Sequence, residues 1–256
     1  GRKTVLTKIM IDAGHGGADP GAVYNGRQEK DDNLNLALAV GRILEEDGYE
    51  VEDTRTKDLY QTPYEKAELG NGSGADLFVS IHRNSSVFPD QYSGVETLVF
   101  DNSGQKARAA ANINERLEQL GFRNIGVIER PNLVVLNSTD IPALLVEAGF
   151  INNSEDNRLF DQQFDAIARA IAKGIEDAYP AVKPEVYYRV QTGMFKNRDN
   201  AERMLYRLQA DGFPVFLTYR DGLFRVQVGA FRELENAVQM EQRLRRRGYE
   251  TWIVSE

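Results

Sequence analysis

Residues 9–15 read Ile-Met-Ile-Asp-Ala-Gly-His, a strand-like apolar run that stops at His15. A second apolar run, Leu-Phe-Val-Ser-Ile, stops at His82, and these are the only two histidines in the 256-residue chain. A third run, Ala-Leu-Leu-Val, stops at Glu147. In an open, mostly parallel sheet, ligands bind at the carboxyl ends of the strands. We therefore expect these three side chains to lie together at one edge of such a sheet.

Segments typical of strands and helices alternate along the first 180 residues. Apolar side chains recur at helical spacing between Asp32 and Asp47, and Gly48 is well placed to end that helix. The turn-rich run Gly-Asn-Gly-Ser-Gly at residues 70–74 separates two further elements. We predict further strands over residues 49–54, 94–100, 132–136 and 143–147. We predict further helices over residues 65–69, 106–120 and 161–179. This alternation predicts an α/β fold with a mostly parallel, twisted sheet flanked by helices.

Two prolines, Pro180 and Pro184, interrupt this alternation because neither can continue a helix. We predict a first domain over residues 1–180, a linker over 181–185 and a second domain over 186–256. The length of the chain is compatible with two domains.

The second domain contains an internal repeat. The segment Arg-Val-Gln-Thr-Gly-Met-Phe beginning at Arg189 recurs as Arg-Val-Gln-Val-Gly-Ala-Phe beginning at Arg225. Each copy has the pattern of a strand, a helix and a strand, so the repeat predicts a small α+β domain of the βαββαβ, ferredoxin-like type. Two copies are too few for a solenoid.

Alternation along these strands predicts what each face of the second sheet carries. One face should carry Val190, Thr192 and Met194, with Val226, Val228 and Ala230, and should pack on the helices. The opposite, open face should carry four polar side chains: Arg189, Gln191, Arg225 and Gln227. Such a face is often merely solvated. The repeated Arg-x-Gln-x-Gly pattern leads us to favour a binding surface.

Composition excludes several classes of protein. The net charge of −8 is unevenly split, and the acidic first domain argues against nucleic acid as its substrate, because binding to phosphates needs a basic surface. No apolar run is long enough to span a bilayer. No signal peptide is visible at the start of the chain. The chain has no cysteine, which excludes disulfides and thiolate metal ligands and leaves His, Glu and Asp as zinc donors.

The residues at the strand ends are suited to hydrolysis at a metal ion. Hydrolytic zinc sites typically use three protein ligands and keep a water molecule in the fourth position. His15 and His82 supply two nitrogens, and Glu29, in a loop that can fold back over the strand ends, is the candidate third ligand. Glu147 is then the natural general base, which takes a proton from water and passes it to the leaving nitrogen.

Each of these residues also has an ordinary structural interpretation. A histidine or glutamate at the end of a strand is most often structural, and Asp12 is as readily a strand-end carboxylate as a group that orients a ligand. The joint presence of His15, Glu29, His82 and Glu147 in glycine-rich surroundings favours the metal site.

Several motifs in the first domain resemble those of zinc-dependent N-acetylmuramoyl-L-alanine amidases of amidase type 3, in the same order along the chain. They are Asp-Ala-Gly-His-Gly-Gly at 12–17, Asp-Pro-Gly at 19–21, Glu29, Thr-Arg at 54–55, Ser-Ile-His-Arg-Asn at 80–84 and Val-Glu-Ala-Gly-Phe-Ile-Asn-Asn at 146–153. The resemblance implies hydrolysis of the amide between N-acetylmuramic acid and L-alanine in peptidoglycan. It implies His15, Glu29 and His82 as zinc ligands, Glu147 as the base, and a location outside the cytoplasm, in the cell wall or secreted.

The second domain resembles a SPOR domain, through its two Val-Gln-x-Gly-x-Phe segments and its βαββαβ pattern. The resemblance implies binding to glycan strands stripped of their stem peptides, which is the product of the first domain. The surface through Gln191 and Gln227 is the expected contact.

Three departures from the family pattern bear on substrate preference, and one of them is Gly70-Asn71 in place of an Ala-Asn pair. Arg83 replaces a small residue, and we expect it to be solvated or to contact a carboxylate of the stem peptide. Lys66 replaces an arginine. Some relatives carry an inserted helix that plugs the zinc site, whereas residues 100–133 here have room for one ordinary helix, so we expect an open site.

Two alternatives belong to other functional classes. The first is a non-catalytic wall-binding protein that keeps the amidase fold, against which the complete set of four site residues counts. The second takes the tail as an RNA-recognition module, which shares the βαββαβ fold. That module would need stacking aromatic side chains on the glutamine-bearing strands.

Overall fold

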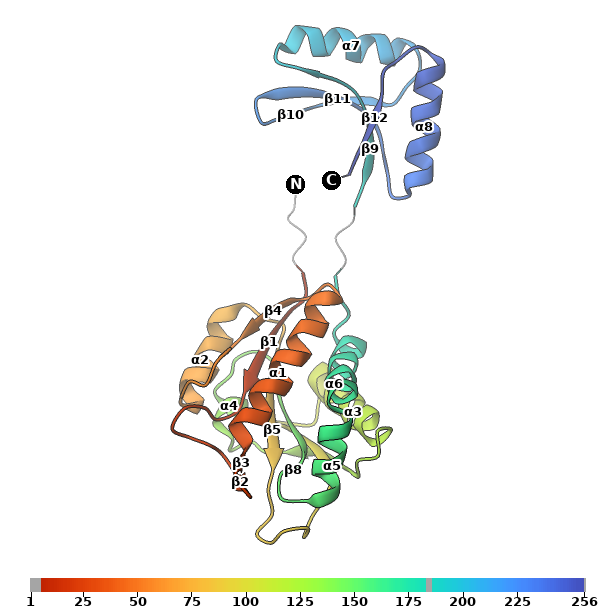
Figure 1. Ribbon diagram of the computed structural model, residues 1–256. Helices are drawn as coiled ribbons and strands as arrows, with labels where there is room; N and C mark the ends of the chain where they lie inside the picture. Colours follow the sequence, from red (N-terminus) through yellow and green to blue (C-terminus); the bar gives the residue numbers. More distant parts are fainter. Residues whose placement is uncertain (1–5, 183–185, 256) are drawn as a thin grey trace. The chain divides into compact units, whose positions relative to one another are not determined.

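The computed structural model describes residues 6–182 and 186–255, which belong to two compact units, Gly1–Lys183 and Pro184–Glu256 (Figure 1). The predicted linker, residues 181–185, falls largely outside the described residues, as do the first five residues of the chain. Within residues 6–182 and 186–255, no helix is both long and apolar enough to cross a membrane.

The first unit is built on a six-stranded mixed sheet. The strand order is β4 (Glu50–Asp53), β1 (Lys8–Ala13), β5 (Leu77–Asn84), β8 (Ala143–Phe150), β6 (Val95–Val99) and β7 (Asn124–Glu129). All neighbouring strands are parallel except β6 and β8, which pair antiparallel. The predicted α/β fold with a mostly parallel sheet is confirmed. The carboxyl ends of β1, β5 and β8 consequently share one edge of the sheet.

Helices cover both faces of this sheet (Figure 1). Alternating side chains of β1 explain why, since Ile9 and Ile11 enter one buried cluster and Met10 enters another. The larger cluster packs under α1 (Glu29–Glu46), α3 (Gly104–Glu118) and α6 (Phe164–Ala178). The smaller cluster packs under α2 (Pro63–Ser73) and α4 (Val134–Asn137). The remaining elements are α5 (Ser154–Gln162) and a short hairpin of β2 (Val23–Tyr24) and β3 (Arg27–Gln28).

Two local predictions for this unit are wrong. The strand expected over residues 132–136 is instead the one-turn helix α4, and β7 was not anticipated. A helical turn places the adjacent Val135 and Leu136 in the same apolar cluster, whereas a strand would point them to opposite faces. The expected turn at residues 70–74 lies within α2 as far as Ser73, because the helix ends only at the left-handed Gly74.

The second unit is a four-stranded antiparallel sheet with two helices, and the predicted βαββαβ order is confirmed. Its elements are β9 (Tyr188–Phe195), α7 (Arg198–Ala210), β10 (Val215–Arg220), β11 (Leu223–Phe231), α8 (Leu234–Arg246) and β12 (Trp252–Ser255). The sheet order is β10, β11, β9, β12. Val190, Val226 and Val228 are buried in one cluster with side chains of both helices.

Irregular pairing between β9 and β11 corrects part of the predicted facing pattern. The register shifts between Val226 and Gln227, and again between Val228 and Phe231. An extra residue at a bulge reverses which face the following side chains occupy. Met194 is therefore 50% exposed, and Ala230 is also exposed, although both were expected to pack on the helices. Phe195 and Phe231 pack against the core in their place.

Candidate metal centre

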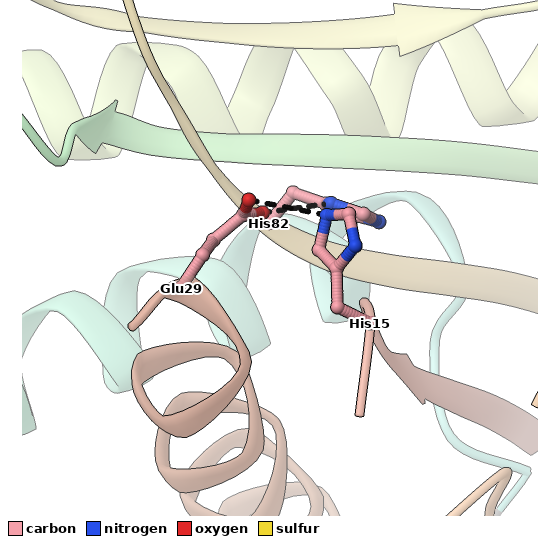
Figure 2. A group of neighbouring side chains, drawn as sticks. All are labelled: His15, Glu29 and His82. Carbon is pink, nitrogen blue, oxygen red and sulfur yellow. Dashed lines mark hydrogen bonds and ion pairs between the residues drawn. The ribbon is translucent and has the colours of Figure 1, made fainter. Parts of the chain in front are cut away.

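Three side chains from separate elements converge at the carboxyl edge of the first sheet (Figure 2). His15 follows β1, Glu29 begins α1, and His82 lies near the end of β5. Each offers one ligand atom, and these atoms all lie within 4.8 Å of one another. Glu29 bridges the two rings, with Oε2 3.1 Å from Nε2 of His15 and Oε1 2.9 Å from Nδ1 of His82. The imidazole rings stand nearly perpendicular, with centroids 5.0 Å apart.

Two glycines permit this convergence. A Cβ atom at Gly14 would lie 2.3 Å from the His82 ring, so only glycine allows the ring to cross the β1 turn there. At Gly21, whose φ is +66°, a Cβ atom would lie 2.5 Å from Oε2 of Glu29. The glycine residues of this motif thus allow the backbone to pass close to the candidate ligands.

Neighbouring groups hold His15 and Glu29 in these positions. Asp19 Oδ2 lies 2.8 Å from Nδ1 of His15, which leaves Nε2 facing Glu29. Asn33 donates from Nδ2 to Oε1 of Glu29 at 3.1 Å, and the backbone N–H of Ala22 donates to Oε2 at 3.0 Å. Sequence reasoning did not assign Asp19 or Asn33. The signals available were an acidic residue in the loop after His15 and a polar residue one turn along α1 from Glu29.

The charges of this group are strongly coupled. Burial disfavours the charged form of Glu29, but the two imidazoles outweigh it and hold the pKa of the carboxyl far below its usual range. Burial also lowers the pKa of His15, whereas Glu29 and Asp19 raise it, with a net result of about 9. Glu29 is therefore a permanent carboxylate at working pH, which suits a ligand for a cation.

Glu147 lies on the strand next to His82. The parallel pairing of β5 and β8 places Glu147 directly opposite His82, and the antiparallel pairing of β8 and β6 places Glu96 opposite Glu147. Directly paired residues project from the same face of a sheet. Burial raises the pKa of Glu147 to about 7. Its Oε2 atom is buried and, among the described residues, has no hydrogen-bond partner.

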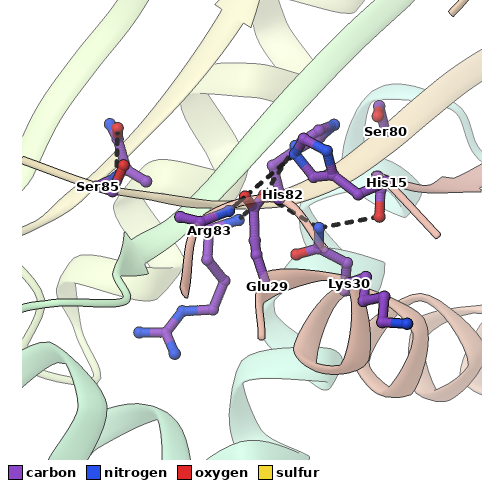
Figure 3. A network of polar contacts seen from close by, with 12 residues as sticks. His15, Glu29, Lys30, Ser80, His82, Arg83 and Ser85 are labelled. Carbon is purple, nitrogen blue, oxygen red and sulfur yellow. Dashed lines mark hydrogen bonds and ion pairs between the residues drawn. The ribbon is translucent and has the colours of Figure 1, made fainter. Parts of the chain in front are cut away.

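Arg83 follows His82 but points away from the imidazoles, as Figure 3 shows. The side chain is buried, and its Nη1 donates to Asp32 at 2.9 Å. Nε donates to the carbonyl of Ala148 at 3.0 Å, and the guanidinium lies 4.2 Å from the centroid of the Phe160 ring. The expectation of a solvated arginine is therefore wrong, and these internal contacts give Arg83 a structural role. Its backbone N–H still serves the site, because it donates to Oε1 of Glu29 at 3.1 Å.

Asp12 also has a structural role. Its carboxylate is fully buried and lies 2.6 Å from Nζ of Lys66, and it accepts hydrogen bonds from Thr54 at 2.7 Å and Ser80 at 2.5 Å. These contacts join β1 to its two neighbouring strands beneath the site. Lys66, which departs from the family pattern, is the counterion of this network.

Residues 100–133, which were expected to leave the metal site open, pack on the core of the first unit. Residues 100–133 contain α3 and β7, and α3 buries Ala109, Ala110 and Ile113 in the larger core cluster. The helix packs on α6 rather than on the carboxyl edge of β1 and β5.

In the second unit, one row of paired residues crosses the open face of the sheet. Phe216 pairs with Gln227, Gln227 with Gln191, and Gln191 with Trp252. Gln227 donates to Oε1 of Gln191 at 3.3 Å, and Nη1 of Arg189 donates to Oε1 of Gln227 at 3.4 Å.

The four polar residues predicted for this face do lie on it, since Arg225 projects with Gln227 two residues along β11. Their predicted exposure is wrong for the two glutamines, because Gln191 is 3% and Gln227 0% exposed. Trp252, which is 39% exposed, was not singled out from the sequence. Its position beside Gln191 depends on how β12 pairs with β9.

Comparison with known proteins agrees with this architecture. The family model described as N-acetylmuramoyl-L-alanine amidase matches residues 9–177, and the SPOR domain model matches residues 184–255. The sporulation-specific N-acetylmuramoyl-L-alanine amidase of Bacillus subtilis (strain 168) is 35% identical over 224 residues, which cover 84% of this chain and 86% of that relative. The N-acetylmuramoyl-L-alanine amidase CwlM of Bacillus licheniformis is 35% identical over 223 residues, with the same coverage.

Among solved structures, the catalytic domain of the amidase CwlV from Bacillus (Paenibacillus) polymyxa var. colistinus has a TM-score of 0.61 and 34% sequence identity. The alignment covers 67% of this chain and 97% of that one. These likenesses extend over the sheet that carries the three converging side chains. The chain therefore belongs to the N-acetylmuramoyl-L-alanine amidase family and carries a SPOR domain in its second unit.

Proposed function

We propose that His15, Glu29 and His82 hold a catalytic zinc ion and that Glu147 is the general base of this amidase. The reaction of the family is hydrolysis of the amide that joins N-acetylmuramic acid to the L-alanine of the peptidoglycan stem. The observation that carries the proposal is the convergence of two imidazoles and one carboxylate, from three separate elements, within 4.8 Å.

The donor set fits zinc rather than a harder cation. Two imidazole nitrogens and one carboxylate oxygen are a common set in catalytic zinc sites, whereas Mg²⁺ and Ca²⁺ prefer oxygen donors alone. Glu29 is already ionised, and the hydrogen bond between His15 and Asp19 orients the ring as neighbours of zinc ligands commonly do. Oε2 of Glu147 is a buried acceptor that has no hydrogen-bond partner within residues 6–182 and 186–255, as a base awaiting a water proton would be.

Two carboxylates in different environments take different roles here. Glu29 cannot act as a base, because its oxygens already contact both imidazoles and two backbone N–H groups. Glu147 has a pKa of about 7, so it can accept a proton from the attacking water and return it to the leaving nitrogen of L-alanine. When bound, zinc would supply Lewis-acid polarisation of the scissile carbonyl.

The division of labour that we propose follows the predicted domains: residues 1–180 for catalysis, 181–185 as linker and 186–256 for glycan binding. We infer that denuded glycan contacts the row from Phe216 to Trp252 together with Arg189 and Arg225. Phe216 and Trp252 at the ends of the row offer stacking surfaces, and the two guanidinium groups are donors for sugar hydroxyls. The buried glutamines bond to each other beneath this surface and hold the row in place. A protein that acts on peptidoglycan works outside the cytoplasm, and we propose that this one is secreted to the cell wall.

Metal analysis paired with product identification on purified peptidoglycan tests the enzymatic proposal. We expect about one zinc per chain, as a single mononuclear site requires. We also expect release of stem peptides with a free L-alanine amino group, abolished by chelation and restored by zinc. Protein that is fully loaded with zinc but releases no peptide would favour the alternative of a wall-binding protein.

The proposed role of the second unit has a separate test. Binding of the protein to glycan strands freed of stem peptides is expected, with no binding to RNA of similar length. RNA binding without glycan binding would instead favour the RNA-recognition alternative, for which Phe216 and Trp252 would be the stacking residues.

A further inference from the structure

The loop between β5 and β6, residues 85–94, exposes apolar side chains beside the proposed active site. It begins three residues after His82 and projects beyond the strand ends (Figure 1). Val87 is 84% and Phe88 66% exposed. Exposed apolar side chains that stand together commonly mark a binding surface.

Polar contacts hold this loop in one conformation. Asn152 accepts from the Ser86 N–H at 3.0 Å and donates to the Ser86 carbonyl at 2.7 Å. Asp90, whose φ is +58°, donates its N–H to the Asn152 carbonyl at 2.9 Å. The Asp90 carboxylate accepts from the N–H and hydroxyl of Ser154 at 2.6 and 3.0 Å. These contacts lie on either side of Val87 and Phe88, whose side chains remain exposed.

The loop and the segment to which it is bonded each follow a strand of the proposed active site. The loop itself continues β5, which carries His82, and Asn152 and Ser154 directly follow β8, which carries Glu147. The apolar tip is therefore placed relative to the reacting bond by the same two strands that place the metal ligand and the base. A surface held by these two strands is suited to contact the part of the substrate next to the cleaved bond.

The chemistry of the tip selects one part of the substrate. Residues 85–94 contain no lysine or arginine, and the only acidic residue, Asp90, is bonded to Ser154. The loop thus offers no cation for the carboxylates of a stem peptide. Sugar rings present uncharged C–H faces, and such faces pack well on aliphatic and aromatic side chains.

We propose that Val87 and Phe88 form a platform on which sugar rings of the glycan strand pack next to the muramic acid whose amide is cleaved. This inference rests on the proposed amidase function. It assigns recognition of the polymer to the first unit itself, independently of the SPOR domain.

The test compares two substrates with the 256-residue chain, which contains both units. For Val87→Ser/Phe88→Ser, we expect KM for stem-bearing glycan oligomers to rise about tenfold, as loss of a partly buried aromatic contact would produce. KM for a single N-acetylmuramoyl-peptide, which has no neighbouring sugars, should change little. Phe100→Ser is the matched control, because Phe100 is 44% exposed and follows the antiparallel strand β6, at the opposite edge of the sheet.

Three results would overturn the platform: unchanged KM for the oligomers, an equal loss on both substrates, or a loss confined to binding of anionic lipid vesicles. Wild-type protein that cleaves neither substrate would instead refute the amidase proposal. The platform would then be judged by binding of stem-bearing oligomers to zinc-loaded Glu147→Gln protein, with and without the two loop substitutions.

Discussion

His82 and Glu147 lie directly opposite each other on the parallel strands β5 and β8. Side chains paired in this way project from the same face of the sheet and have neighbouring Cβ atoms. The same row continues to Glu96 on β6, so one candidate ligand and two carboxylates are aligned across three strands. Sheet pairing alone therefore delivers the proposed base to the proposed metal centre.

Removing the base should abolish hydrolysis without removing the metal. For Glu147→Gln we expect turnover to fall by about 10²–10⁴-fold, the typical contribution of a general base. Zinc content should stay at the wild-type value, because the three ligands remain. Stem-peptide release and metal analysis on the same sample provide the measurement, with the exposed Glu46→Gln as control. Persistent activity would remove Glu147 from the mechanism.

Loss of the group that orients His15 should weaken zinc binding. Asp19→Asn removes the carboxylate 2.8 Å from Nδ1 of His15, and substitutions of this kind typically cost about 10–100-fold in metal affinity. Competition with a chromophoric chelator measures this affinity. Asp31→Asn, an exposed change in the first turn of α1, should leave it unchanged. Equal affinities for the two variants would show that Asp19 does not support the ligand.

Zinc binding should release a proton at neutral pH. In the metal-free protein the pKa of His15 is raised to about 9, so the ring is protonated at pH 7.5, yet a ligand imidazole must be neutral. We expect affinity to increase with pH up to about 9 and about one proton to be released near pH 7.5. Calorimetry in buffers of different ionisation enthalpy measures the release. A binding heat independent of the buffer would contradict this prediction.

The same linkage bears on stability. A raised pKa of His15 stabilises the metal-free fold below the ordinary pKa of 6.5, and this contribution is lost as pH rises through about 9.

Glu147 should destabilise the metal-free fold at alkaline pH. Its pKa rises from 4.5 to about 7 on folding, so the folded protein resists ionisation and loses stability as pH rises between these values. Glu147→Gln should therefore raise the free energy of unfolding at pH 8, by about 1–3 kcal/mol, and by less at pH 5. Denaturant unfolding of chelator-treated protein at both pH values measures the difference. A gain independent of pH would point to another cause.

Glycan binding by the second unit should be visible in fluorescence. Trp252 is the only tryptophan of the chain, and it stands beside Gln191 on the proposed glycan-binding face. Denuded glycan should change its emission, and Trp252→Ala should weaken binding about tenfold. Tyr206→Ala, which alters a 62% exposed aromatic residue on α7, is the control. Undisturbed emission at saturating glycan would place the contact elsewhere.

Much of this arrangement could be predicted from the sequence, because the residue at which an apolar run stops marks the end of a strand. The runs that stop at His15, His82 and Glu147 predicted one functional edge, and parallel pairing places all three there. The repeated segments beginning at Arg189 and Arg225 likewise predicted the order of elements in the second unit. Glu29 was harder to assign, because it does not end an apolar run. Its assignment required either a loop that folds back over the strand ends or the resemblance to a family.

The sequence by itself determined the order of elements in the second unit and the residues at which the strands β1, β5 and β8 end, because these depend on local periodicity. Only the tertiary structure decided which side chains meet: Asp19 against His15, Arg83 turned inward to Asp32, and Gln191 buried between Gln227 and Trp252. Bulges reversed the facing of Met194 and Phe195 for the same reason. Contacts between distant segments and irregular pairing follow from the packing of whole elements, which no local pattern encodes.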